Sequence, residues 1–134
     1  QLGVMERIQK GGFCPFCQEN ISKADMRPVI RKGRYWHIRR NRWPYENTRI
    51  HLLFIHTAHV ERLSDIKPEA AAELFSLATW AEKKYRIRGG GIGIRFGDPR
   101  VNNATVGHLH AHIVTADITD KNDPRYKPVR FRVG

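Results

Sequence analysis

Three histidines stand at every second position between residues 108 and 112, in the run His-Leu-His-Ala-His-Ile-Val. Side chains on a strand alternate between its two faces, so His108, His110 and His112 would share one face, with neighbouring imidazoles about 7 Å apart. Three interpretations are open for such a row. It is a polar surface face, a zinc site built on His-x-His pairs, or a nucleophilic centre in which one neutral imidazole attacks phosphorus and carries a covalent phosphoryl or nucleotidyl group.

A second motif with chemical potential is the pair Cys14 and Cys17, the only cysteines in the chain. A redox pair with this spacing usually follows a strand and opens a helix, and no strand pattern precedes Gly11-Gly12. Metal ligation is therefore favoured over redox chemistry, while two reduced, partly buried thiols remain the alternative. Zinc takes four sulfur or nitrogen ligands, so two histidines would complete such a site.

The charge of the chain is strongly positive, because 24 lysines and arginines stand against 13 acidic residues and leave a net charge of +11. Residues 26–45 contain seven of these cations and no acid, and Lys127, Arg130 and Arg132 form another cluster. Such a surface attracts nucleotides, nucleic acid or acidic membranes, although it also fits a solvated face that keeps the protein soluble. No apolar run approaches the roughly 20 residues that span a bilayer, and no segment resembles a signal peptide. We expect a cytoplasmic protein without a membrane span.

The patterns of strands and helices around these residues predict an α+β fold with a mainly antiparallel sheet of about five strands. Two short strands are expected in residues 28–38, around a turn at Lys32-Gly33, and an apolar strand in residues 50–55. Further strands are expected at 92–96 and 106–115, with an edge strand at 129–133, where apolar residues alternate with arginines.

One long helix is predicted from Pro68 to Tyr85, with Leu74, Phe75 and Ala78 among the residues of its apolar face. Pro68 suits a first helical turn, and the glycines at 89–91 end the helix. The 134 residues show no repeat or long linker, which predicts a single domain over residues 1–134. It would begin with a cysteine loop at 1–20 and end with a basic tail or edge strand at 117–134.

The row of histidines closely resembles the signature of the histidine triad (HIT) family, in which three histidines alternate with apolar residues. Residues 50–60 are similar to the strand of that family that carries a fourth histidine, followed by a turn and a fifth. Residues 41–45, Asn-Arg-Trp-Pro-Tyr, are similar to the Asn-x-aromatic-Pro-Tyr segment of the branch that contains dinucleoside tetraphosphate phosphorylases. The resemblance covers roughly residues 12–116 and implies a HIT-like fold with short N-terminal elements.

This resemblance implies a role for each matching side chain. His110 would be the nucleophile, His112 would bind phosphate and help to activate the leaving group, and His51 would order the imidazoles. Asn41 matches a residue that binds ribose hydroxyls, although the chain from it to His51 is longer than usual. Thr105 stands where the family has a serine or threonine that donates to phosphate.

The sequence departs from the family just before the triad. Ala104 replaces a glutamine that usually contacts the phosphate or the attacking water, and Asn103 is a candidate to take over that contact. This departure leaves the acceptor, water or phosphate, open. We expect the nucleotide base to pack near Trp36.

The resemblance also completes the metal hypothesis. Some bacterial members have a Cys-x-x-Cys pair together with a histidine after the central strand and the first histidine of the triad. Here these residues are Cys14, Cys17, His59 and His108, which would form a closed structural zinc site; no organic cofactor is expected.

The function that the resemblance implies is cleavage of a nucleoside phosphate anhydride or phosphoramidate, such as a diadenosine polyphosphate, through a nucleotidyl-histidine intermediate on His110. A homodimer and an adenine nucleotide substrate are expected from the family. Three alternatives stay open: phosphorolysis of a dinucleoside polyphosphate, removal of adenylate from a nucleic-acid end, and a nucleotide-binding regulator without turnover.

Overall fold

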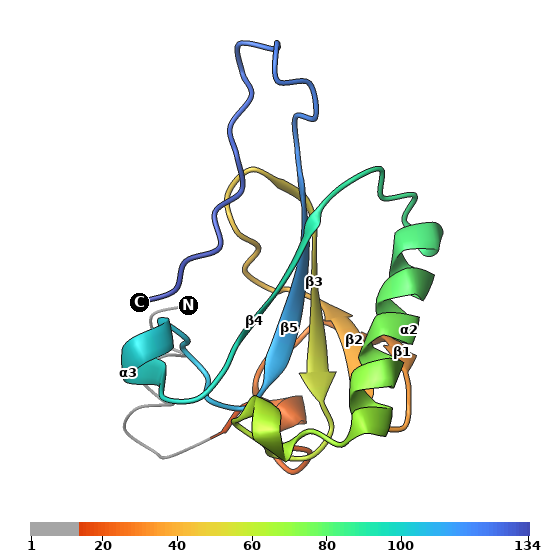
Figure 1. Cartoon of the computed structure of the whole chain (residues 1–134), viewed down its shortest axis with the longest axis vertical. Helices are drawn as coiled ribbons and strands as arrows, with labels where there is room; N and C mark the ends of the chain where they lie inside the picture. Colours follow the sequence, from red (N-terminus) through yellow and green to blue (C-terminus); the bar gives the residue numbers. More distant parts are fainter. Residues whose placement is uncertain (1–13) are drawn as a thin grey trace.

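A computed structural model describes residues 14–134, so residues 1–13 of the predicted N-terminal loop lie outside the described part. Five strands form one antiparallel sheet in the order β1-β2-β3-β5-β4 (Figure 1). In chain order the strands are β1 (Val29–Lys32), β2 (Trp36–Arg40), β3 (Thr48–His56), β4 (Gly91–Arg95) and β5 (His110–Ala116). The predicted α+β architecture is confirmed.

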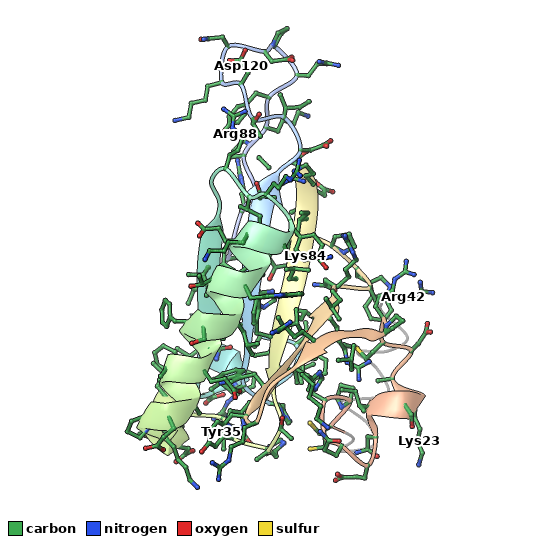
Figure 2. The ribbon with its side chains drawn as sticks, turned by 90° about the vertical axis from the view of Figure 1, so that its right-hand side faces the viewer. Lys23, Tyr35, Arg42, Lys84, Arg88 and Asp120 are labelled. Carbon is green, nitrogen blue, oxygen red and sulfur yellow. The ribbon has the colours of Figure 1, made fainter. Side chains whose placement is uncertain are left out.

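The longest helix, α2 (Pro68–Lys84), covers one face of the sheet. Three short elements complete the described chain: η1 (Ile21–Lys23), η2 (Leu63–Asp65) and α3 (Pro99–Asn102). Lys23 of η1 lies on the other side of the sheet from α2 (Figure 2). None of the helices in residues 14–134 combines the length and the apolar character that a membrane span needs.

The apolar face of α2 differs from the predicted one by a small rotation. Ala70, Leu74, Leu77 and Ala81 are buried, whereas Phe75 is 64% exposed. The buried residues recur at intervals of three and four, as the helical repeat requires for a stripe that faces a sheet. Phe75 stands one position off this stripe and faces outward.

Strands β3 and β5 lie side by side in the middle of the sheet and bury both of their faces. On the α2 side, one cluster joins the helix to Leu109, just before β5, and to alternate strand residues (Trp36, Ile38, Ile50, Leu52, Phe54, Ala111 and Ile113). On the opposite side, Phe16, Leu53, Ile55 and Val106 form a second, smaller cluster. The second cluster ties the N-terminal segment to the sheet, on the face that carries the triad.

The predicted strand at residues 106–115 begins later, at His110. His110 is opposite Ile55 of β3 and Arg95 of β4, where both ladders end. Before it, Leu109 bonds through its backbone N–H to Val60 and through its carbonyl to His56. His108 therefore lies before the strand, at a bend in the chain.

The predicted edge strand at residues 129–133 is wrong, because this segment has no strand structure. The carbonyl of Arg132 accepts a hydrogen bond from the guanidinium of Arg95 at 2.7 Å. The Phe131 ring lies directly over Gly93, where a Cβ atom would come within 2.7 Å of it. Side-chain contacts with β4 thus replace the backbone ladder that the alternating pattern indicated.

Glu73 of α2 connects the helix to the turn between β1 and β2. Its carboxylate accepts hydrogen bonds from the backbone N–H groups of Arg34, Tyr35 and Trp36 at 2.7 to 3.0 Å. Hydrogen bonds to a charged acceptor contribute more than neutral ones. We expect Glu73→Gln to lower the free energy of unfolding by about 2 kcal/mol in urea denaturation at pH 7. An unchanged denaturation midpoint would show that water replaces these bonds without loss.

Candidate functional site

The histidines of the site come from the two central strands. His51 on β3 and His110 and His112 on β5 all point away from α2, because their neighbours Leu52, Ala111 and Ile113 fill the helix-side core. His51, His110 and His112 are each less than 10% exposed. The rings of His110 and His112 lean together, with centroids 4.9 Å apart, closer than the 7 Å that the backbone spacing predicts.

His110 is held with one ring nitrogen fixed and the other available. Its Nδ1 lies 2.8 Å from the carbonyl oxygen of His108, which can only accept, so Nδ1 carries the proton and donates it. The Phe16 ring packs edge-on against the imidazole at 4.9 Å. The lone pair of a neutral His110 is therefore on Nε2, in the same pocket as His112.

A hydrogen-bonded chain fixes the tautomers of the other two imidazoles. The backbone N–H of Tyr45 donates to Nδ1 of His51 at 3.1 Å, so the proton of His51 is on Nε2. Nε2 of His51 is 2.8 Å from Nδ1 of His112 and donates to it. The proton of a neutral His112 is consequently on Nε2.

Burial keeps these three imidazoles neutral at pH 7. Desolvation is the largest cause in each case and lowers the pKa of His110 and of His51 to about 4. The pKa of His112 falls to about 2, because His110, His51 and Arg95 add repulsion to its burial. A neutral imidazole retains the lone pair that nucleophilic attack requires.

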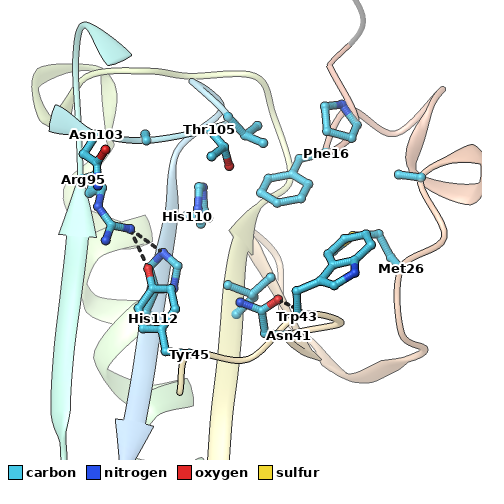
Figure 3. A pocket seen from close by; sticks show the side chains of 15 residues that line it. Phe16, Met26, Asn41, Trp43, Tyr45, Arg95, Asn103, Thr105, His110 and His112 are labelled. Carbon is cyan, nitrogen blue, oxygen red and sulfur yellow. Dashed lines mark hydrogen bonds between the residues drawn. The ribbon is translucent and has the colours of Figure 1, made fainter. Parts of the chain in front are cut away.

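His110 and His112 line a pocket of about 220 Å³ with two different halves (Figure 3). One half is apolar and includes Phe16, Met26, Trp43 and Leu53. The other half is polar, with Arg95, Asn103, Thr105, His110 and His112. A pocket of this kind suits a ligand with a flat apolar part joined to an anionic part.

The pocket includes four of the five residues predicted to bind substrate, namely Asn41, Asn103, Thr105 and His112. Asn41 is oriented by the backbone N–H of Trp43, which donates to its Oδ1 at 2.9 Å. Asn103 has a left-handed backbone (φ 64°) at the end of α3 and is exposed. Asn102, by contrast, is buried and bonds within its own loop, to the Phe96 carbonyl and the Ala104 N–H.

The structure does not place Trp36 at the pocket, so the expectation that it packs against a nucleotide base is wrong. Trp36 is fully buried in the core beside α2, where its Nε1–H donates to the carbonyl of Ala70 at 2.8 Å. Trp36 begins β2 and shares the helix-side face with Ile38. Trp43, seven residues later, lines the apolar half of the pocket instead.

Sequence reasoning missed Arg95 and Tyr45, which lie next to His112 in Figure 3. Arg95 Nη1 donates to the Tyr45 hydroxyl at 2.7 Å and lies 3.4 Å from Nε2 of His112. Arg95 is the last residue of β4 and is opposite His110 in the ladder. A charged residue at the end of a strand can indicate a functional site. The pairing of β4 with β5, which brings Arg95 next to His110, was not evident from the sequence.

A separate group of side chains has the arrangement of a metal site. One ligand atom from each of Cys14, Cys17, His59 and His108 lies within 4.8 Å of the others. Nδ1 of His59 is 3.2 Å from Sγ of Cys17, and Nδ1 of His108 is 3.5 Å from Sγ of Cys14. Tetrahedral zinc, with its usual bond lengths, separates sulfur and nitrogen ligands by about 3.5 Å.

Outer contacts orient both imidazoles of this group. Nε2 of His108 donates to the carbonyl of His56 at 2.6 Å, and Nε2 of His59 bonds to the carboxylate of Glu61 at 2.9 Å. Metal-binding histidines usually donate their second N–H in this way, which leaves the first nitrogen free to ligate. The four residues therefore fit a closed, four-coordinate structural metal site.

Comparisons with known proteins agree with this architecture. The family model described as HIT domain matches residues 28–118. No curated protein shows significant similarity to this sequence. Among solved structures, a zinc-bound histidine triad family protein from Mycobacterium smegmatis shares 25% identity, with a TM-score of 0.61 over 86% of this chain and 83% of that one.

Two further solved structures share the fold at 17% identity. A histidine triad nucleotide-binding protein from Candida albicans has a TM-score of 0.63 over 75% of this chain and 73% of its own. A HIT family hydrolase from Legionella pneumophila Philadelphia 1 has a TM-score of 0.58, over 82% of this chain and 98% of its own. The match of the family model spans more than half of the sequence and includes all three histidines of the row. The chain therefore belongs to the HIT domain family.

Proposed function

We propose that this protein cleaves a nucleoside phosphate anhydride or phosphoramidate through a nucleotidyl-histidine intermediate on His110. The observation that carries the proposal is the single hydrogen bond from Nδ1 of His110 to the carbonyl of His108. That bond commits the ring proton to Nδ1, so the lone pair on Nε2 is aimed at the pocket. The nucleotide-binding and hydrolase descriptions of similar structures support the same class of reaction.

The reaction has two displacements at the α-phosphorus. In the first, the Nε2 lone pair of His110 forms an N–P bond, and the bond from phosphorus to the leaving group breaks with its electron pair on the leaving atom. The N–H of His112 stabilises the charge that develops there. In the second, water forms a P–O bond, the N–P pair returns to His110, and a proton passes to solvent. Positioning and electrostatic stabilisation supply most of the rate enhancement.

In this proposal the base occupies the apolar half of the pocket, between Phe16 and Trp43, and Asn41 binds the ribose. Asn103 or Thr105 donates to the phosphate in place of the family glutamine. The test is product analysis with diadenosine tetraphosphate and adenosine phosphoramidate, each with and without inorganic phosphate. Nucleoside diphosphate formed only with phosphate would establish phosphorolysis. Absence of both product and adduct would leave a nucleotide-binding regulator.

The pH dependence of the first displacement follows from the burial of His110. Because burial lowers the pKa of His110 to about 4, the rate of adduct formation should stay level from pH 8 to about 5.5 and decline as the pH falls through 4. An exposed imidazole, with a pKa near 6.5, would lose about tenfold by pH 5.5. Rapid-quench measurement of the adduct gives this profile, and a midpoint near pH 6.5 would contradict it.

A nucleic-acid end is a second candidate substrate, favoured by the charge around the site. A cleft next to Arg95 includes Lys127, Arg130 and Arg132 of the C-terminal segment, with Glu46 as the one acidic residue among its described lining. An adenylated 5′-phosphate DNA end would place its backbone along these cations. Affinity for such an end should decrease steeply as salt rises. A flat salt dependence would exclude backbone contact.

We also propose that the metal group holds zinc and that the protein forms a homodimer. The donor set of two sulfurs and two nitrogens is typical of structural zinc. Phe75 on α2 and Ile92 on the edge strand β4 are exposed apolar side chains, and their burial against a second copy of the chain would favour the dimer. Sedimentation equilibrium tests the dimer, and a monomeric mass at micromolar concentration would exclude it.

A further inference from the structure

Arg95 is held in the pocket by contacts with three neighbouring residues. Its Nε donates to the carbonyl of Arg132 at 2.7 Å, and Nη1 donates to the hydroxyl of Tyr45, also at 2.7 Å. The guanidinium carbon lies 4.0 Å from the centre of the Phe131 ring. The cation is thus fixed on the same side as His110, its ladder partner. A guanidinium with so few free rotations is already organised for binding.

The proton positions around Arg95 leave a place for an acceptor. Because Tyr45 N–H occupies Nδ1 of His51, and His51 donates to Nδ1 of His112, Nε2 of His112 is an N–H donor. Nη1 of Arg95, which can only donate, lies 3.4 Å from that Nε2. Two donors therefore face each other, and only an atom with free lone pairs near both can satisfy them.

The surroundings favour an anion as that acceptor. The described residues of the pocket include no carboxylate, and Arg95 has no ion pair in the described part of the chain. Its Nη1 bond to Tyr45 uses a lone pair of the hydroxyl, which leaves the hydroxyl proton as a further donor. Three donors thus converge beside the nucleophile.

We propose that Arg95 is a catalytic residue that binds an oxygen of the reacting phosphoryl group together with His112, and that Phe131 and Arg132 position it. This inference rests on the proposed function. As His110 attacks, negative charge builds up on the phosphoryl oxygens and on the leaving atom, close to the guanidinium. A fixed cation in a partly buried site stabilises that charge more strongly than water does.

The C-terminal segment has this positioning role because of Gly93. The ring of Phe131 lies where a side chain at residue 93 would be, and it also contacts His112 edge-on, with centroids 5.5 Å apart. Phe131 therefore packs over β4 and contacts both His112 and Arg95. The carbonyl of the next residue, Arg132, then reaches Nε of Arg95.

The test of Arg95 compares Arg95→Gln and Arg95→Lys with Arg125→Gln. Arg125 is an exposed arginine of the same C-terminal region that pairs with Asp123. Arg95→Gln should lower the single-turnover rate of adduct formation by about 10²-fold or more, with Arg95→Lys intermediate, while Arg125→Gln stays at the wild-type rate. Guanidinium chloride at millimolar concentration should partly restore Arg95→Ala, a rescue that a purely structural role would not allow. A rate for Arg95→Gln within twofold of wild type would overturn the proposal.

The positioning role of Phe131 is tested by a double-mutant cycle. Phe131→Ala should slow adduct formation by about tenfold in the wild-type background and have no further effect in Arg95→Gln, because neighbouring residues that act through one group are not additive. Independent, multiplicative losses would show that Phe131 does not act through Arg95.

Binding of AMP, measured by titration calorimetry, separates this inference from the proposed function. If the wild-type protein turned over no nucleotide, the proposed function would fail, but AMP should still bind about tenfold more weakly to Arg95→Gln than to Arg125→Gln. Equal affinities for AMP in these two variants would overturn the role of Arg95 in phosphate binding, whatever the outcome for turnover.

Discussion

Replacing His110 with alanine is expected to abolish turnover, with a loss of about 10⁴-fold or more in kcat and no nucleotidyl adduct by mass spectrometry. The physical reason is specific to this imidazole. Its Nδ1–H is committed to the carbonyl of His108, so its Nε2 carries the free lone pair. In contrast, His112 and His51 each direct Nδ1 toward an N–H donor and keep their protons on Nε2.

The control for this experiment is another buried histidine outside the pocket. His37 on β2 is 3% exposed and does not line the pocket, so His37→Asn should retain activity after correction for any loss of folded protein. Thermal melting of both variants shows whether each is folded. Turnover or adduct formation by folded His110→Ala would remove His110 as the nucleophile.

Removal of the metal is the second change with a large expected effect. The group of Cys14, Cys17, His59 and His108 joins the N-terminal segment to the residues around β5. Without a cation, the two thiols and two imidazoles lose the coordination bonds that would link them. We expect chelation to lower the free energy of unfolding by on the order of 5 kcal/mol and the melting temperature by at least about 10 °C.

Metal analysis of the purified protein should find one equivalent of zinc, and its re-addition should restore the melting temperature. Cys14→Ser and Cys17→Ser should contain no stoichiometric metal, whereas His37→Asn should retain it. Chelation should also raise KM, since Phe16, which lies between the two cysteines in the sequence, lines the apolar half of the pocket. A melting temperature insensitive to chelator, with wild-type protein free of metal, would contradict the zinc proposal.

Much of the fold followed from simple periodicities in the sequence. The two-residue repeat predicted that His110 and His112 share one face of a strand, since every second residue on a strand points to the same side. Their neighbours Ala111 and Ile113 accordingly lie in the helix-side core. The four metal-group residues were also predicted together, and the structure brings them within ligand distance of one another. That prediction depended on resemblance, because spacing alone does not bring residues 14 and 108 together.

Other features depend on tertiary contacts that no local pattern encodes. Trp36 and Trp43 are both aromatic residues near strand β2, and only the packing of α2 against the sheet decides which of them is buried in the core. The segment at 129–133 alternates like a strand, yet the space above Gly93 draws Phe131 onto β4 instead. Arg95 enters the pocket through the pairing of β4 with β5, which links residues distant in sequence.

His108 contacts both sites, the metal group through its ring and His110 through its backbone. Its ring is turned toward the cysteines, while its backbone oxygen holds the imidazole of His110. Thermodynamic linkage requires that two ligands of one protein change each other's binding affinity by the same factor. If the bound metal raises the affinity of the protein for a nucleotide, then a bound nucleotide must raise the affinity for the metal by the same factor. The metal would then be bound most tightly in the complex with nucleotide.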